Sequence, residues 1–374
     1  MLYFIIGVLA LLVALGLTVI LIDAVPLVLR WLDRIHTGAF NDEASWENAV
    51  KKVDNRWLKK TPSVKVTDNT RLTVIDRLKG KYKSAKIQSW QKAALLLGAD
   101  EGDAQGFIKR ELESFKNGLA KYETPDSALL AWALLRRTED KMNLKPLCDA
   151  VFVMLCENAG KDGTVVYNKT VPDMRFVDTV GMVCPFLFEY AAVYKKTEAS
   201  ALAKKQLDEY LKYGMHERYF VPVHCFNIKN SSPSGIYGWG RGCGWLAMGF
   251  CGAIISGEDD DYLDDAEKYA ETLLSFQRAN GSWSRQIFSE ITGESSATAM
   301  IACFMELLYK KTGKQRYHEA AGSAAEYLRS VTRVSGKVDM AQGDTKGIGF
   351  YSTLLDRLPA AQGFTSWLNI LKKT

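Results

Sequence analysis

The sequence predicts an all-α protein in which about twelve helices form one globular domain behind an N-terminal transmembrane helix. Two observations lead to this fold class. From Trp46 onward, apolar residues recur three and four positions apart, which is the period of a helix with one buried face. Before them, residues 2–22 contain no charged side chain over a length that can cross a bilayer as a helix.

The apolar segment is expected to be a retained membrane anchor covering residues 1–24. It lacks a basic start and has only a poor cleavage site at Ala24, which argues against a removed signal peptide. Residues 25–45 are expected to be a connector, and residues 46–374 the globular domain. Arg30 and Arg34 follow the span and favour a cytoplasmic domain, although two arginines leave the side of the membrane open.

Twelve segments carry the helical period, and 47% of the chain is hydrophobic, which is enough to bury a sizeable core. The segments span residues 46–60, 89–99, 104–122, 126–137, 144–159, 176–196, 199–214, 244–256, 262–278, 296–311, 317–331 and 350–373. Strand signals are scarce, and residues 163–167 (GTVVY) are the best candidate for a short strand.

The connectors in the second half of the chain predict how the helices are arranged. Elaborate connectors precede Asp178, Arg241, Thr298 and Tyr351, at intervals of 63, 57 and 53 residues. Each interval fits one helical hairpin, which favours a closed ring of six inner and six outer helices, with a superhelical solenoid as the alternative. In a ring, the inner helices begin at one rim, where their positive N-terminal ends favour an anionic ligand.

Composition excludes several classes of function. The net charge of +5 is spread along the chain without a basic run, so a nucleic-acid partner is not expected. The seven cysteines are odd in number and form no C-x-x-C pair, which indicates neither a disulfide framework nor a zinc site. We expect most of them to be buried small residues, and we expect no metal or cofactor.

Asp178 and His224 are the candidate catalytic residues. Asp178 begins an apolar helix in RFVDTVGMVCPFL, where it could simply cap the helix. Desolvation by its apolar neighbours would instead raise its pKa towards a value useful for donating a proton. His224 lies in a stretch without helical period and is expected in a loop; both a structural and a catalytic role stay open.

The stretch YGWGRGCGW, residues 237–245, is typical of a site for a flat anionic ligand. Its glycines allow close approach, Trp239 and Trp245 offer flat apolar faces, and Arg241 suits a carboxylate. A tight turn into a helix with buried aromatic rings is the alternative. Burying an arginine without a partner is costly, so we expect either a ligand or a fixed acidic neighbour.

Two further segments are candidates for substrate binding. Trp283 follows a glycine turn in NGSWSRQI, and Thr298 lies among small side chains in GESSATAM, where a helix can begin close to a ligand. Plain packing explains either segment equally well.

Together these stretches resemble the unsaturated glucuronyl and rhamnogalacturonyl hydrolases of glycoside hydrolase families 88 and 105. The resemblance runs from about Trp46 to the C-terminus. Residues 178–187 fit D-T/G-x-x-M-x-x-P-F-L, and residues 239–245 fit W-x-R-G-x-G-W. Residues 280–283 fit D/N-G-x-W, residues 294–300 fit E-x-S-A-T-A-M, and residues 347–363 look like the family's closing segment.

The resemblance implies an (α/α)6 barrel and an unusual reaction, hydration of the C4=C5 double bond that polysaccharide lyases leave in a terminal uronic acid. It implies that Asp178 protonates C4 and then helps water add to C5, after which the hemiketal opens and releases the rest of the chain. His224 would contact the sugar or assist the proton steps. Arg241 would bind polar substrate groups, and Trp239 and Trp245 would form a stacking wall.

The sequence departs from the family pattern in places. Glu123 and Asp126 are the only acids near the position of the family's second aspartate, and we add both to the substrate-binding set with Trp283 and Thr298. Tyr167 or Asn168 replaces a common histidine, Phe176 a tryptophan and Cys243 an asparagine. We therefore predict a membrane-anchored hydrolase of unsaturated uronyl oligosaccharides whose exact uronide is open. The alternatives are another carbohydrate-active enzyme of the same barrel, such as an epimerase, and a catalytically inactive glycan-binding protein.

Overall fold

The computed structural model describes residues 1–65, 73–80, 84–258 and 261–374 of the protein. Its described helices are α1 (Leu2–Arg34), α2 (Glu43–Lys59), α3 (Thr73–Leu78), α4 (Ser89–Gly98), α5 (Glu101–Lys116), α6 (Asp126–Arg137), α7 (Lys141–Glu157), α8 (Val177–Tyr194), α9 (Thr197–Tyr213), α10 (Gly240–Ser256), α11 (Leu263–Ser275), α12 (Ser295–Thr312), α13 (Gln315–Ser330) and α14 (Pro359–Leu371). Its described strands are β1 (Ser63–Lys65), β2 (Ser84–Lys86), β3 (Met174–Phe176), β4 (Val223–Asn227), β5 (Pro233–Tyr237), β6 (Ala341–Gln342) and β7 (Leu355–Asp356).

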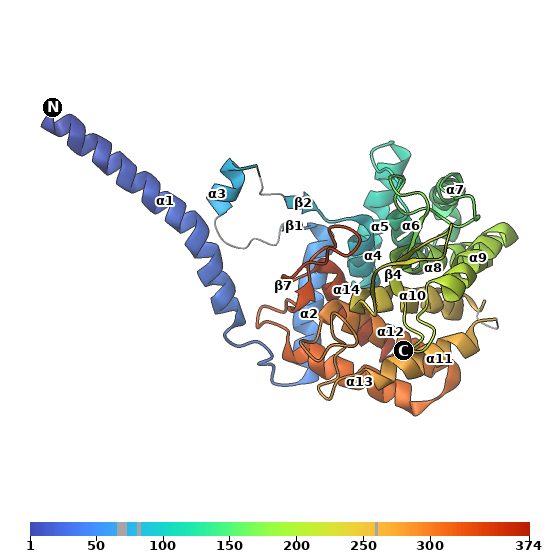
Figure 1. Cartoon of the computed structure of the whole chain (residues 1–374). Coiled ribbons are helices and arrows are strands. Elements are labelled where there is room, and N and C mark those ends of the chain that lie inside the picture. The colour runs from blue at the N-terminus through green and yellow to red at the C-terminus, as the bar shows by residue number, and fades with distance from the viewer. Residues whose placement is uncertain (66–72, 81–83, 259–260) are drawn as a thin grey trace.

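Six helices form a closed inner ring. Helices α4, α6, α8, α10, α12 and α14 each pack on the next, and α14 packs back on α4. Helices α2, α5, α7, α9, α11 and α13 surround them (Figure 1). The structure therefore confirms the (α/α)6 barrel, and the contact between α14 and α4 closes the ring, which a solenoid would leave open.

The inner helices are apolar on every side because other helices surround them. All residues from Gly240 to Ala253 of α10 are buried, for example. Outer helices keep one polar face, as α9 does with its lysines and glutamates. Close packing within the ring depends on small residues: a Cβ added at Gly181 of α8 would lie 2.4 Å from the backbone oxygen of Trp245 in α10.

Three local predictions were wrong. The last helix was expected over residues 350–373 but begins at Pro359, because residues 355–356 instead pair as β7 with β6 and proline suits the first turn of a helix. Residues 163–167 form only an isolated bridge, between Ala159 and Val165, which closes a turn rather than a strand. His224 lies on β4, not in a loop, because residues 223–237 fold into the β4–β5 hairpin that pairs with β3.

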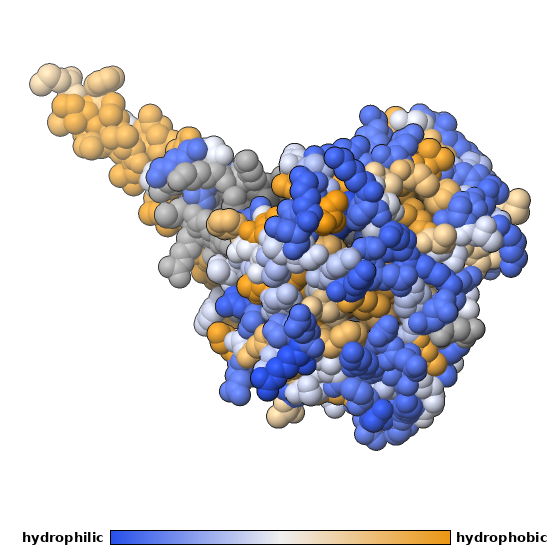
Figure 2. All heavy atoms as spheres, turned by 45° about the vertical axis from the view of Figure 1, so that its right-hand side comes forward, coloured by the Kyte–Doolittle hydropathy of each residue, from blue (hydrophilic) through white to orange (hydrophobic). Residues whose placement is uncertain are grey.

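Helix α1 projects away from the barrel (Figure 1), and none of its residues, all of which are described, is buried. Figure 2 shows it as a continuous hydrophobic rod beside a largely hydrophilic surface. Among the described residues, α1 and α8 are the two helices long and apolar enough to span a membrane, but 78% of the apolar window of α8 is buried in the barrel. Helix α1 is therefore the candidate span, and it continues as a helix ten residues into the expected connector, although Pro26 lies inside it.

Candidate active site

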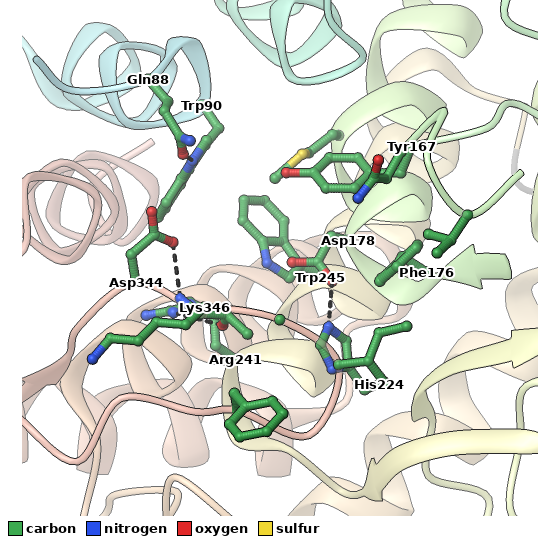
Figure 3. A pocket seen from close by; sticks show the side chains of 17 residues that line it. Gln88, Trp90, Tyr167, Phe176, Asp178, His224, Arg241, Trp245, Asp344 and Lys346 are labelled. Atoms are coloured by element: carbon green, nitrogen blue, oxygen red, sulfur yellow. Dashed lines mark hydrogen bonds and ion pairs between the residues drawn. The ribbon is translucent and has the colours of Figure 1, made fainter. Parts of the chain in front are cut away.

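A cavity of about 490 Å³ opens at the rim where inner helices begin. It is walled by the N-terminal parts of α4, α8 and α10, by β3 and β4, by the segment 167–171, and by the loop between β6 and β7. The described lining consists of Gln88, Trp90, Tyr167, Asn168, Val171, Phe176, Asp178, Met182, His224, Arg241, Trp245, Asp344, Thr345, Lys346, Gly347, Ile348 and Phe350. Figure 3 shows polar groups of Asp178, His224, Arg241 and Asp344 gathered around this space.

Asp178 is the second residue of α8, directly after strand β3. Its side chain is 14% exposed, and its buried Oδ2 atom has no hydrogen-bond partner among the described residues. Burial raises the pKa of Asp178 to about 7, although the positive charge of Arg241 opposes the rise. The carboxyl group can therefore hold a proton near neutral pH and release it without first breaking a hydrogen bond at Oδ2.

His224 faces Asp178 from β4, with Nε2 at 3.6 Å from Oδ2 (Figure 3). Its other nitrogen, Nδ1, lies 3.0 Å from the hydroxyl of Tyr351. That hydroxyl also accepts a hydrogen bond from the backbone N–H of Ile236. Either tautomer of His224 fits the contact with Tyr351, because the hydroxyl can still donate to Nδ1 or accept from it.

Burial, and then the charge of Arg241, lower the pKa of His224 to about 4. The imidazole is therefore neutral in the working range of most enzymes. It does not supply a positive charge to Asp178.

Arg241 is buried at the start of α10, and its guanidinium has the partners that such burial requires. It donates to the backbone oxygens of Gln342 at 2.7 Å and Gly343 at 2.9 Å. It also lies 5.2 Å from the ring centre of Trp239. The guanidinium thus fixes the loop after β6 and places a positive charge between Asp178 and the loop carboxyl of Asp344.

Asp344 is a site residue that the sequence interpretation did not include. Burial raises its pKa, and the charge of Arg241 opposes that rise. The feature of the sequence that could have identified Asp344 is a single acid between glycines in QGDTKG, just before the segment that resembles the family's closing segment. Tyr351, within that segment, was likewise noted only as a marker of helix spacing.

The two tryptophans of the glycine-rich motif have different positions. Trp245 lines the cavity and makes an edge-to-face contact with Trp90 at 5.4 Å between ring centres. Trp239 is outside the described lining; it is buried behind His224, at 4.9 Å between ring centres. Its Nε1 donates to the side-chain oxygen of Gln342 at 2.9 Å, so it supports His224 and the loop from behind.

Trp283 and Thr298 are not part of the described lining either. Both are buried, and they bond to each other: the backbone N–H of Trp283 donates to the Thr298 hydroxyl at 3.0 Å. The indole N–H of Trp283 donates to the backbone oxygen of Leu273 at 2.7 Å. These contacts join the start of α12 to the end of α11.

Glu123 and Asp126 line a neighbouring cavity of about 800 Å³, which shares Gln88, Tyr167 and Asn168 with the first cavity. Glu123 is exposed, with Lys121 at 3.5 Å. Asp126 accepts hydrogen bonds from the backbone of Ser89 at 3.0 Å and the hydroxyl of Thr124 at 2.6 Å.

All seven cysteines lie in described ranges and are free thiols; Cys156 is exposed and the other six are buried. The part of the chain that the structure describes contains no group of three or more His, Cys, Asp or Glu side chains placed to hold a metal ion.

The described residues thus form a closed double ring of helices, with a protonatable carboxyl, a neutral imidazole and a buried arginine at one rim. The model of glycosyl hydrolase family 88 matches residues 51–353. The chain belongs to this family and is a glycoside hydrolase. No curated protein matches the chain.

Solved structures share its fold. A possible member of family GH105 from Salmonella enterica serovar Paratyphi A is 15% identical, with a TM-score of 0.72 over 89% of this chain and 95% of that one. The unsaturated glucuronyl hydrolase of Bacillus sp. GL1 is 17% identical, with a TM-score of 0.63 over 87% and 96% of the two chains. An unsaturated glucuronyl hydrolase specific for heparin is 14% identical, with a TM-score of 0.66 over 87% and 96%.

Proposed function

We propose that this glycoside hydrolase removes a terminal 4,5-unsaturated uronic acid from oligosaccharides made by polysaccharide lyases. The observation that carries the proposal is the buried Oδ2 atom of Asp178, which has no hydrogen-bond partner among the described residues, on a carboxyl that lines the cavity and whose pKa is raised to about 7. A group of this kind suits proton donation to carbon at neutral pH. Two structural neighbours are unsaturated glucuronyl hydrolases, which supports the substrate class.

The proposed reaction begins when Asp178 gives its proton to C4 of the unsaturated ring, which leaves positive charge shared by C5 and the ring oxygen. The Asp178 carboxylate then accepts a proton from water as that water bonds to C5. The hemiketal formed at C5 opens by breaking its bond to the ring oxygen. The hemiacetal left at C1 then breaks down to an aldehyde and releases the remaining saccharide, so no second carboxylate has to attack the anomeric carbon.

The neighbouring groups have roles that follow from their contacts. In the tautomer that carries its proton on Nε2, His224 stabilises the Asp178 carboxylate after the proton has left, because Nε2 lies 3.6 Å from Oδ2. The positive charge of Arg241 favours a substrate that carries a carboxylate. Trp245 is part of the cavity wall but only 1% exposed, so it shapes the wall by packing against Trp90, while Trp239 supports His224 from behind.

Helix α1 anchors the enzyme to a membrane in this proposal. Its apolar residues 2–22 have the length of a bilayer's hydrocarbon core, and they carry no charge. A protease-protection assay on membranes would establish the side on which the barrel lies.

The test is the ultraviolet absorbance of unsaturated uronyl disaccharides, which disappears when the double bond is hydrated. The full-length protein should abolish the absorbance of at least one member of a broad panel, and Asp178→Asn should lose this activity. Asp173→Asn is the matched control, because Asp173 lies five residues upstream and pairs with Lys229 outside the cavity. An unchanged absorbance across the panel, or full activity of Asp178→Asn, would refute the proposal.

A catalytically inactive glycan-binding protein is the second candidate. The observation in its favour is that Asp126, near the position of the family's second aspartate, lies outside the described lining and has its oxygens occupied by Ser89 and Thr124. Such a protein would bind the panel without turnover, and Asp178→Asn would not weaken binding.

A further inference from the structure

The loop that covers one side of the cavity is the middle of a small hairpin. Strands β6 and β7 pair at its base, Ala341 with Asp356 and Gln342 with Leu355. We call residues 341–356 the active-site hairpin. Its loop supplies Asp344 and five other residues of the cavity lining, the carbonyls that hold Arg241, and the Tyr351 hydroxyl that orients His224.

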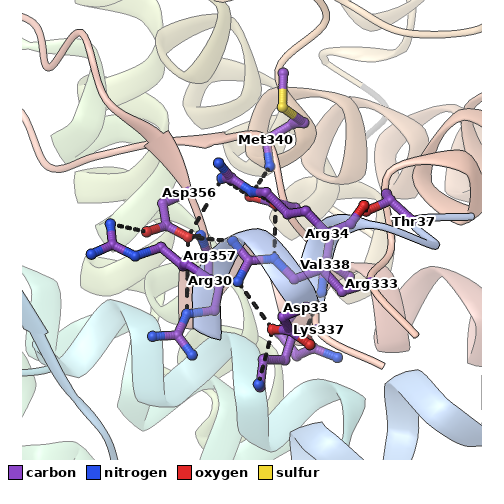
Figure 4. Close-up of polar contacts among 12 residues, drawn as sticks. Arg30, Asp33, Arg34, Thr37, Arg333, Lys337, Val338, Met340, Asp356 and Arg357 are labelled. Carbon is purple, nitrogen blue, oxygen red and sulfur yellow. Dashed lines mark hydrogen bonds and ion pairs between the residues drawn. The ribbon is translucent and has the colours of Figure 1, made fainter. Parts of the chain in front are cut away.

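Two arginines bind the base of this hairpin, and each contacts both Asp339, just before β6, and a residue of β7. Arg34, the last residue of α1, donates to both carboxylate oxygens of Asp339 at 2.5 and 2.8 Å, and to the backbone oxygen of Leu355 at 3.1 Å. Arg333 donates to Asp339 at 2.8 Å and to Asp356 at 2.5 Å. The contacts of Arg34 and Arg333 therefore run from Asp339, just before β6, to β7 (Figure 4).

Helix α1 also holds the second arginine. Asp33 accepts hydrogen bonds from Arg333 at 3.1 Å and from Lys337 at 3.2 Å. Arg333 is only 1% exposed and Asp339 only 3% exposed, whereas Asp33 is 20% and Arg34 39% exposed, so the network has a buried centre and a partly exposed edge. Loss of Arg34 leaves Asp339 with Arg333 alone, and loss of the Asp33 carboxylate removes one of the acids around the buried Arg333, which is costly.

We propose that Arg34 and Asp33, at the end of the N-terminal helix, are positioning residues for the active site. They fix the base of the active-site hairpin, and the hairpin in turn places Asp344 beside Arg241 and Tyr351 against His224. The N-terminal helix is therefore part of the catalytic unit in addition to its role as an anchor. The hairpin contacts stand on the structure alone, whereas the effect on catalysis rests on the proposed function.

The test uses Arg34→Ala in the full-length protein, with amide hydrogen exchange and steady-state kinetics as readouts. Exchange across residues 343–354 should rise roughly tenfold while the inner helices stay protected, because only the base of the hairpin has lost its bonds. The value of kcat/KM should fall by a similar factor, and the KM should rise because Asp344 and its neighbours line the cavity.

Two variants separate positioning from general effects. Arg34→Lys keeps the charge but not the fork that spans Asp339 and Leu355, so it should restore part of the lost activity. Arg30→Ala is the matched control one turn earlier in the same helix: it removes a single 3.5 Å contact to Asp356, which Arg333 still holds. It should behave like the wild type.

Unchanged exchange in residues 343–354 of Arg34→Ala would overturn the inference, and so would faster exchange without a change in kcat/KM. If Arg30→Ala had an equal effect, the cause would be the loss of a positive charge, and the inference would again be overturned. If Arg34→Ala fails to fold, Asp33→Asn, which removes the carboxylate that holds Arg333, carries the same test. If the wild type hydrates none of the disaccharides, the proposed function fails, and the exchange measurement still decides whether α1 controls the hairpin.

Discussion

At the scale of single residues, the site depends on one carboxyl group, that of Asp178, whose buried Oδ2 atom has no hydrogen-bond partner among the described residues. The Asp178 carboxyl is buried next to apolar side chains, and the apolar setting was visible in the sequence as Phe176, Val177, Val180 and Met182. The contacts of His224 with Asp178 and with Tyr351 were not predictable, because these residues lie far apart in the chain and are brought together only by the fold. The sequence therefore predicted an acid in an apolar setting and a candidate histidine, but not that the two side chains face each other.

Activity should fall as pH rises through about 7, because Asp178 must carry a proton to give to the substrate. His224, whose pKa is lowered to about 4, stays neutral over the same range and should add no ionisation above pH 5. The measurement is kcat/KM on an unsaturated disaccharide from pH 5 to pH 9. A plateau that extends to pH 9 would contradict the role given to Asp178.

Asp178→Asn should stabilise the folded protein at alkaline pH while it removes activity. The folded pKa of Asp178 is about 7, above its value in an unfolded chain, so the wild type loses stability as pH rises from about 4 to 7. The amide carries no such penalty. We expect a gain of roughly 1–3 kcal/mol in the free energy of unfolding at pH 8 and almost none at pH 4.

Denaturant titration of both proteins at the two pH values measures the difference. An equal gain at pH 4 and pH 8 would mean that the ionisation of Asp178 is not its cause.

Tyr351→Phe should lower kcat by roughly tenfold, because it removes the hydroxyl that holds the His224 imidazole through Nδ1 at 3.0 Å. It also leaves the N–H of Ile236 without its hydroxyl acceptor, at a modest cost in stability of about 1 kcal/mol. Kinetics and thermal unfolding measured together separate the two effects. Tyr219→Phe, on a partly exposed tyrosine that is not among the cavity-lining residues, is the control and should keep full activity.

At the scale of elements, helices were predicted well and hairpins poorly. The period of apolar residues is local, so α4, α8 and α12 could be read from short segments. A strand of two residues has no such period, and residues 350–358 even carry apolar spacing typical of a helix. Their spacing reflects contacts instead: Phe350 lines the cavity and Leu355 pairs with β6.

Gly181→Ala should destabilise the barrel, because the added Cβ would lie 2.4 Å from the Trp245 backbone oxygen and 2.7 Å from its ring. Overpacking of this kind costs about 1–3 kcal/mol, and displacement of Trp245 should also raise KM. Gly102→Ala, on outer helix α5 with open space around it, is the matched control and should be neutral or slightly stabilising. Chemical denaturation and steady-state kinetics of both variants provide the comparison, and equal stabilities would contradict the tight α8–α10 contact.

At the scale of the whole molecule, the sequence predicted a barrel and an apolar helix but not how the two are joined. Arg30 and Arg34 entered the interpretation only as signals of membrane orientation. In the structure both lie against acids of the barrel, Asp356 and Asp339. This use could not be predicted, because their partners are some three hundred residues away in the chain.

If α1 is the membrane anchor proposed above, its continuous course gives the molecule a defined geometry at the lipid surface. If residues 2–22 cross a bilayer, the twelve residues from Asp23 to Arg34 extend about 18 Å beyond it as a helix before they meet the barrel. Any tilt that the span adopts in a thinner or thicker bilayer is then passed to the barrel as a rotation. The distance of the cavity mouth from the lipid headgroups, and the direction in which it opens, would then depend on lipid composition. Substrates would enter the cavity from solution at a defined distance from the membrane.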